Sequence, residues 1–321
     1  MASVGIMPDQ RYLPCVQPQG KFFTFILPAP NGCNLACAFC LIRQRQEINA
    51  STLKPADYAR FIRETASLNP IYAISIQGYE PLLPATLPYT QAVLATGRLL
   101  NLPTDLVTNG LGLRNTIPLL KATRPDRLVV SLDASAEMAA HHDHLRGKNG
   151  AWEATVDGIA CAAAELPSAT QLNVASVLIP SRRDLLDGMP ELLAKLGVRH
   201  WIINPLQKVG NARPGGPADN HERLYTDLLR LQDAADRESI QLEIDDELNC
   251  LNHVQAAAQR PELKRLNVRH IPQGVELIRL LPDGELATGR DILRRQCDNA
   301  PRWNPACETT AQFWDRNAMS G

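Results

Sequence analysis

The sequence contains no apolar run that approaches the roughly 20 residues needed to cross a membrane. Its first residues also lack the charged start and apolar stretch of a secretory signal peptide. Lys and Arg number 33 against 34 for Asp and Glu, so no basic excess exists to neutralise a nucleic-acid backbone. These absences predict a cytoplasmic protein that binds neither a membrane nor a nucleic acid.

Cysteine is present in an informative pattern. A reducing cytosol disfavours disulfides, so the eight cysteines point to metal binding or catalysis. Three of them, Cys33, Cys37 and Cys40, lie close together directly after the first predicted strand. Three thiolates leave one iron of a four-iron cluster open, and an open position distinguishes a catalytic metal site from a closed one. No fourth Cys or His follows at zinc-finger spacing, which argues against a zinc knuckle.

Apolar segments of strand character alternate with segments of helical spacing over the first two-thirds of the chain. Such alternation predicts right-handed βαβ units and a parallel sheet. We therefore expect an α/β fold, a partial (β/α)6 barrel with a small α/β C-terminal extension. The predicted strands are 22–27, 71–77, 104–108, 127–132, 171–178 and 200–204. The predicted helices are 55–68, 89–100, 115–122, 152–165 and 185–196.

The C-terminal third follows a different pattern. It predicts a long charged helix over 218–239, a strand over 240–244 and a hairpin of 275–281 with 285–287. A turn-rich stretch at 211–217 marks the boundary before it. His141, His142 and His144 are expected in a polar loop. The predicted organisation is a tail (1–20), a barrel (21–210) and a C-terminal extension (211–321).

The segment Cys33-Asn-Leu-Ala-Cys37-Ala-Phe-Cys40 resembles the signature of the radical S-adenosylmethionine (SAM) superfamily. That signature has three cysteines separated by three and then two residues, and Phe39 fills its aromatic position. The resemblance implies a [4Fe-4S] cluster on the three cysteines, with an open iron that binds the methionyl part of S-adenosylmethionine. One electron from the cluster cleaves a carbon–sulfur bond and leaves a 5′-deoxyadenosyl radical. An electron donor such as flavodoxin or ferredoxin is implied as a partner.

Motifs after the next three strands resemble the same superfamily in the same order. The segment 77–82 is similar to its Gly-Gly-Glu-Pro motif, with Tyr79 in place of the second glycine. The resemblance implies that Glu80 holds the methionyl amino group, that Ser131 approaches the ribose and that Arg146 lies near the methionyl carboxylate. A planar guanidinium suits a carboxylate, and a hydroxyl suits a ribose. The predicted cofactor-binding residues are Phe39, Gly78, Tyr79, Glu80, Thr108, Asn109, Ser131, Asp133 and Arg146.

The C-terminal hairpin is similar to that of SPASM or twitch extensions, found in one branch of the superfamily. Those extensions bind auxiliary clusters through cysteines, but here 287–289 reads Ala-Thr-Gly where a cysteine is usual. Cys250, Cys297 and Cys307 remain nearby in sequence, and a second cluster on them stays open. Cys250 follows an acidic strand end, and we predict that it donates a hydrogen atom to a substrate radical, as in some epimerases of the superfamily. A packed cysteine is the alternative.

These residues predict a radical SAM enzyme that abstracts hydrogen from a small polar substrate of amino-sugar or cyclitol type, with a redox-neutral outcome such as epimerisation. Only about 20 residues precede the first predicted strand, too few for the peptide-binding domain that peptide-modifying relatives often carry. Three alternatives stay open: a peptide-modifying enzyme, a dehydrogenase with an auxiliary cluster, and a non-catalytic iron–sulfur or zinc sensor.

Overall fold

The computed structural model describes residues 20–28, 33–40, 53–206, 221–245, 253–269, 274–288 and 303–318. Its strands are β1 (Gly20–Ile26), β2 (Ile71–Gln77), β3 (Thr104–Thr108), β4 (Arg127–Ser131), β5 (Gln171–Leu178), β6 (His200–Pro205), β7 (Gln241–Asp245), β8 (Val268–Arg269), β9 (Val275–Leu280) and β10 (Leu286–Thr288). Its α-helices are α1 (Pro55–Leu68), α2 (Leu87–Leu99), α3 (Leu113–Thr123), α4 (Ala139–Arg146), α5 (Ala151–Glu165), α6 (Met189–Lys195), α7 (His221–Arg237), α8 (His253–Gln259) and α10 (Thr310–Ala318). Short 3₁₀ turns are η3 (Ala136–Met138), η4 (Arg183–Leu186) and η5 (Pro261–Arg265).

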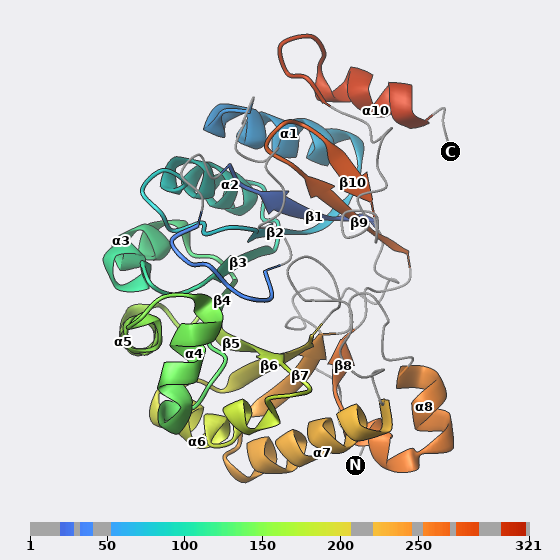
Figure 1. The fold of residues 1–321 in the computed structure, drawn as a ribbon. Coiled ribbons are helices and arrows are strands. Elements are labelled where there is room, and N and C mark those ends of the chain that lie inside the picture. The colour runs from blue at the N-terminus through green and yellow to red at the C-terminus, as the bar shows by residue number, and fades with distance from the viewer. Residues whose placement is uncertain are drawn as a thin grey trace.

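All ten described strands belong to one curved sheet, in the order β10-β9-β1-β2-β3-β4-β5-β6-β7-β8. Neighbours are parallel except β10 and β9, which form an antiparallel hairpin. Helices line the outside of the sheet (Figure 1). β10 and β8 are the two ends of the order and do not pair with each other, so the barrel is open. The predicted α/β class and partial parallel barrel are confirmed.

Helix α1 shows how the sequence builds the outer layer. Pro55 occupies its first turn, and the backbone N–H of Lys54 donates to the Asp57 carboxylate at 2.9 Å, which caps the start. Its buried residues recur at the three- and four-residue spacing of one helix face: Tyr58, Phe61, Ile62 and Thr65. That face packs on the outward side of β1, where the Phe23 and Phe61 rings lie 5.6 Å apart.

Alternate residues of each strand point inward, to the lumen of the barrel. Val129, Ala175 and Ile202 form an apolar layer there, separate from the main core outside the sheet. Ser131 lies two residues beyond Val129, so it shares the lumen face at the carboxyl end of β4. The carboxyl ends of parallel strands meet at one mouth, which is where barrels place their chemistry.

One local prediction is wrong. The histidines 141, 142 and 144 lie in helix α4 and not in a polar loop. His142 and Arg146 are four residues apart on its buried face, and Gly147 ends the helix in the left-handed conformation at φ 67°. Burial of that face stabilises a short helix whose composition reads as polar.

The C-terminal third joins the same sheet. β7 and β8 extend the barrel beyond β6, whereas β9 pairs in parallel with β1 on its other side. The predicted strand near 240–244 and the predicted hairpin are therefore confirmed, and the predicted linker at 211–217 lies outside the described residues. Among the described helices, none is both long and apolar enough to traverse a bilayer.

The last described segment folds back onto α1 (Figure 1). Trp314 of α10 donates from Nε1 to the Thr65 hydroxyl at 3.1 Å. The backbone N–H of Thr310 donates to the Glu64 carboxylate at 2.9 Å. Trp303 lies 5.1 Å from the Phe61 ring, so residues far apart in sequence share one aromatic cluster.

Candidate active site

The cysteine loop, residues 33–40, follows β1 at the mouth of the barrel. Cys33, Cys37 and Cys40 are half-buried and are not joined in disulfides. The Cys33 thiol lies 3.7 Å from the Tyr79 carbonyl and 3.9 Å from the Asn109 amide nitrogen. The loop therefore meets the ends of β2 and β3. Within the described residues, no three Cys, His, Asp or Glu side chains converge as ligands of a single metal ion.

Two thiols of this loop, those of Cys33 and Cys37, are costly to ionise without a cation. Burial raises the pKa of Cys33 to about 11, and the nearby Glu80, Cys37 and Cys40 add to the effect. Burial also raises the pKa of Cys37, although the Arg146 guanidinium opposes it. Thiolates are the form that binds metal, so a cationic cluster would supply the charge that the protein alone does not.

Glu80 is buried beneath the mouth and ties the loop after β2 to the end of β3. Its Oε1 accepts hydrogen bonds from the Thr108 hydroxyl at 2.6 Å and the Leu82 N–H at 2.9 Å. Its Oε2 accepts from the Asn109 N–H at 2.7 Å. Burial raises the pKa of Glu80, and these three donors oppose that rise. All three partners need an acceptor, so the geometry suits the carboxylate and fills three of its roughly four acceptor positions.

Arg146 is held by Asp133 on the side away from the cysteines. Its Nε and NH2 lie 2.7 and 2.6 Å from the same Asp133 oxygen, while the other Asp133 oxygen accepts from the Val177 N–H at 2.8 Å. The remaining nitrogen, NH1, lies 3.8 Å from the Cys37 sulfur. Burial lowers the pKa of Arg146, but Asp133 and Cys37 outweigh it and leave the pKa raised. A permanent positive charge thus faces a cysteine of the loop.

Gly78 and Tyr79 shape the end of β2. Gly78 has φ 113°, and a Cβ there would lie 3.1 Å from the Ile26 side chain, so a larger residue is disfavoured. The Tyr79 side chain packs with Ile26 and Leu281. The substitution of the family's second glycine by Tyr79 is therefore accommodated against the hairpin side of the barrel.

The predicted site residues divide into two groups. The structure brings Cys33, Tyr79, Glu80, Thr108 and Asn109 together at the ends of β1 to β3. A second group lies at the end of β4 and in α4: Phe39, Cys37, Asp133 and Arg146, with the Arg146 guanidinium 5.3 Å from the Phe39 ring. Asp133 is fully buried and Thr108 nearly so, which places them behind the surface of the mouth. Cys250 and Cys297 lie outside the described residues, and Cys307 is exposed.

Two polar residues of the site, Asn34 and His142, were not predicted to belong to it. Asn34 accepts a hydrogen bond from the Asn109 amide at 2.7 Å, which links the cysteine loop to β3. His142 accepts one from the Asp133 N–H at 3.1 Å. Burial lowers the pKa of His142 to about 4, so the neutral ring is the stable form. A polar residue four positions before Arg146 on one helix face was the available signal for His142.

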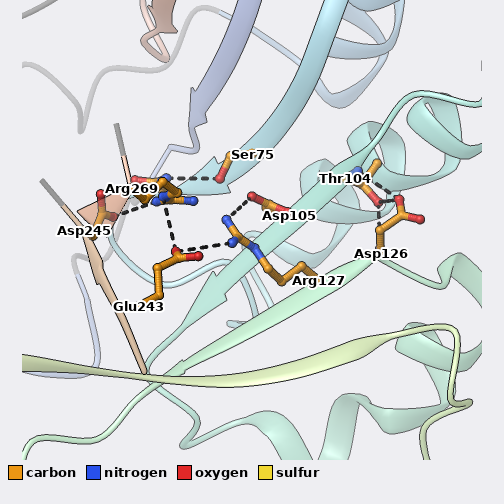
Figure 2. A network of polar contacts seen from close by, with 9 residues as sticks. Ser75, Thr104, Asp105, Asp126, Arg127, Glu243, Asp245 and Arg269 are labelled. Atoms are coloured by element: carbon orange, nitrogen blue, oxygen red, sulfur yellow. Dashed lines mark hydrogen bonds and ion pairs between the residues drawn. The ribbon is translucent and has the colours of Figure 1, made fainter. Parts of the chain in front are cut away.

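Charged side chains lie across the lumen below the mouth (Figure 2). Arg127 of β4 pairs with Asp105 of β3 at 2.7 Å and faces Glu243 of β7 at 3.9 Å. Arg269 of β8 lies 3.3 Å from Glu243 and 2.7 Å from Asp245. We call these five residues the lumen network. It joins strands that are not neighbours in the sheet and gives the lumen a charged floor.

A small hollow opens at the amino-terminal ends of β4 to β7, lined by Arg127, Asn173, His200 and Glu243 among others. The cysteine loop lies at the opposite ends of the strands. Arg127 and Glu243 of the lumen network line this hollow, which is therefore distinct from the mouth at the other ends of the strands.

Sequence comparison with known proteins finds relatives of this chain. The model of the radical SAM superfamily matches residues 27–200. The AdoMet-dependent heme synthase of Methanosarcina barkeri is 37% identical over 131 residues, which cover 40% of this chain and 35% of that protein. The GTP 3′,8-cyclase of Streptomyces coelicolor is 32% identical over 173 residues, which cover 50% and 46%. The matches thus span less than half of either relative.

Solved structures share the fold over nearly the whole chain. SuiB of Streptococcus suis, bound to its precursor peptide SuiA, superposes with a TM-score of 0.71 and 12% identity, covering 97% of this chain and 68% of SuiB. The same protein bound to S-adenosylmethionine gives a TM-score of 0.67 and 14% identity, covering 94% and 66%. At such identities the likeness concerns the fold.

Proposed function

Because this chain belongs to the radical SAM superfamily, we propose that Cys33, Cys37 and Cys40 hold its four-iron cluster at the mouth of the barrel. Membership confirms the predicted family, its enzyme class and its two cofactors, a [4Fe-4S] cluster and S-adenosylmethionine. It also favours an enzyme over a sensor protein.

The cysteine loop fits such a cluster. Three thiols on one loop would supply three ligands and leave one iron for the cofactor. The sulfurs of cluster ligands bind separate irons, so they need not converge on one point as the ligands of a zinc ion do. The raised pKa of Cys33 and Cys37 is the cost that iron binding would offset.

Two groups of side chains support binding of S-adenosylmethionine beside that cluster. We assign the free acceptor position of Glu80 to the methionyl ammonium and the Ser131 hydroxyl to the ribose. Thr108 and Asn109 hold Glu80 in place. We assign Arg146, whose NH1 lies 3.8 Å from the Cys37 sulfur, to the methionyl carboxylate.

The bound cofactors supply a carbon-centred radical that removes a hydrogen atom from the substrate. The single observation that carries our substrate assignment is the lumen network, because a charged floor suits a small polar molecule of amino-sugar or cyclitol type. Asp245 offers a carboxylate to an ammonium or hydroxyl group from the end of β7. A peptide substrate is the second candidate, favoured by the 97% coverage of this chain in the match with peptide-bound SuiB.

We further propose a redox-neutral outcome with Cys250 as the hydrogen donor. Its thiol would give one hydrogen atom to the substrate radical on the face opposite the abstraction. The resulting thiyl radical needs one electron and one proton, which a flavodoxin- or ferredoxin-type donor and water supply. A dehydrogenation would instead send the substrate's electron to an auxiliary cluster, which Cys307, as an exposed residue of the C-terminal segment, does not by itself support.

Cleavage of S-adenosylmethionine tests the first proposal. Anaerobically reconstituted, reduced protein should release methionine and 5′-deoxyadenosine, and replacing Cys33, Cys37 and Cys40 by Ala should abolish both iron binding and cleavage. A triple variant that still binds a redox-active cluster and cleaves the cofactor would overturn the ligand assignment.

Deuterium labelling tests the proposal that Cys250 is the hydrogen donor. With amino sugars and cyclitols in D₂O, the product should carry one solvent deuteron, because a thiol exchanges its hydrogen with water. Cys250→Ala should still form 5′-deoxyadenosine but little product. Product that carries no solvent deuteron, or that forms normally in Cys250→Ala, would refute the donor role. Turnover of a peptide alone would select the second candidate.

A further inference from the structure

The last turn of α4 contacts four consecutive residues of the cysteine loop. The N–H groups of Ala36 and Ala38 donate to the carbonyls of Arg146 and Leu145, at 2.9 and 2.8 Å. Between and beyond these bonds, the Arg146 side chain reaches the Cys37 sulfur and lies over the Phe39 ring. Main-chain and side-chain contacts therefore alternate along the loop.

These contacts use groups that a helix end leaves open. The final carbonyls of a helix have no partner within the helix, and two of those in α4 are satisfied by the cysteine loop. The loop in turn has its amides fixed by a regular element and not by solvent. The shape of the loop thus depends on where α4 ends.

Gly147 sets the distance between α4 and the loop. It has φ 67°, and a Cβ at this position would lie 2.8 Å from the Ala36 Cβ and 2.9 Å from the Ala36 carbonyl oxygen. Such contacts are too close for backbone and Cβ atoms, so any side chain would push the loop away. Gly150 has a similar φ of 74° with nothing within 4 Å of its Cβ position.

Asp133 fixes the orientation of the Arg146 guanidinium. Asp133 binds two guanidinium nitrogens, and the Val177 N–H holds the other oxygen of Asp133. The carboxylate lies on the far side, so the positive end of the pair faces Cys37. An iron–sulfur cluster becomes more negative when reduced, and nearby charge and hydrogen bonds to its sulfurs set its potential.

We propose that Arg146 and Gly147 are positioning residues for the cluster: they fix the loop that holds it, and Arg146 raises its reduction potential. This inference rests on the proposed ligand role of Cys33, Cys37 and Cys40. It concerns a contact from outside the cysteine motif, and it gives Arg146 a function that does not require S-adenosylmethionine to be bound.

A pair of glycine variants tests the loop contact. Gly147→Ala and Gly150→Ala introduce the same left-handed alanine, so Gly150→Ala measures the effect of the backbone conformation alone, and any further loss in Gly147→Ala comes from the contact with Ala36. After anaerobic reconstitution, Gly147→Ala should lose most of its iron and sulfide to a chelator, while Gly150→Ala retains a wild-type content. Equal retention in both variants would overturn the positioning role of Gly147.

A double variant tests the charge and avoids an unpaired buried group. Asp133→Asn combined with Arg146→Gln removes both charges and keeps polar side chains. Redox titration monitored by electron paramagnetic resonance, without S-adenosylmethionine, should give a more negative midpoint potential than wild type. Arg114→Gln, which breaks an exposed pair with Asp157, should leave the potential unchanged.

Different experimental results would refute this inference and the proposed function. An unchanged potential in the double variant would overturn the electrostatic role of Arg146. A wild-type protein that binds no four-iron cluster would instead refute the ligand assignment itself. A double variant that binds no cluster, while a circular dichroism spectrum shows the native fold, would support positioning, since the cysteines are intact.

Discussion

Lowering the pH should reduce the free energy of unfolding through protonation of His142, which lies in α4. This ring accepts a hydrogen bond at Nδ1 from the Asp133 N–H, and the residue is 1% exposed. Burial lowers its pKa from 6.5 to about 4. Between these two values the unfolded chain binds a proton that the folded chain does not. The free energy of unfolding therefore falls as the pH falls through this window.

The size of the effect follows from the two pKa values. Their difference corresponds to about 3 kcal/mol once the pH lies below both. At about pH 5 the loss relative to neutral pH is about 2 kcal/mol. His142→Asn keeps an acceptor for the Asp133 N–H and removes the titratable ring, so it should lack this part of the pH dependence.

Urea unfolding followed by circular dichroism, at about pH 7.5 and about pH 5, measures this difference. Other groups titrate in both proteins, so the informative quantity is the change in wild type minus the change in His142→Asn. The exposed neighbour gives the control, since His141→Asn should behave as wild type. Equal losses of unfolding free energy in wild type and His142→Asn would refute the reasoning.

Three further substitutions probe the fold and the site. Glu80→Gln places an amide nitrogen against a donor and should cost about 1–3 kcal/mol in urea unfolding, with weaker equilibrium binding of S-adenosylmethionine; unchanged binding would contradict the role of Glu80. Gly284→Ala puts a Cβ 2.1 Å from the Trp303 carbonyl oxygen, so its thermal midpoint should fall further than that of Gly197→Ala, which has open space around it. Arg127→Met should cost about 3–5 kcal/mol because it leaves lumen carboxylates uncompensated. Arg114→Met, at an exposed pair, should cost less than about 1 kcal/mol, and similar losses in both would count against a structural role for the lumen network.

The sequence predicted several regular elements of the fold with their observed bounds. The predicted bounds are those of the structure for four elements: β2, β3, β5 and α1. Apolar periodicity and the Pro and Gly residues that end regular segments were the signals. Local patterns were enough because these elements bury one regular face. Helix α4 was missed because its stability comes from the buried contacts of His142 and Arg146, which the amino-acid composition of the segment does not reveal.

The site could be predicted only in part. Motif order identified residues at the ends of successive strands, and the structure brings most of them to one mouth. The contacts among them were not visible, because Asp133 and Cys37 meet Arg146, and the Val177 N–H meets Asp133, only after the strands have paired. Charge is similarly ambiguous in a sequence. No local pattern marks Glu243 or Arg269 as a lumen residue, because only the pairing of β7 with β6 and of β8 with β7 brings them there.

The position of β1 has a consequence for synthesis of the chain. Its two sheet neighbours are β2, which follows soon after, and β9, whose register joins Lys21 to Glu276. On the ribosome, one edge of β1 therefore stays unpaired until nearly the whole chain has emerged, and the face of α1 that α10 covers is bare for the same time. An open, apolar strand edge is a template for another nascent chain. Changes in residues 274–288 should therefore appear first as aggregation during expression, well before any effect on chemistry at the mouth.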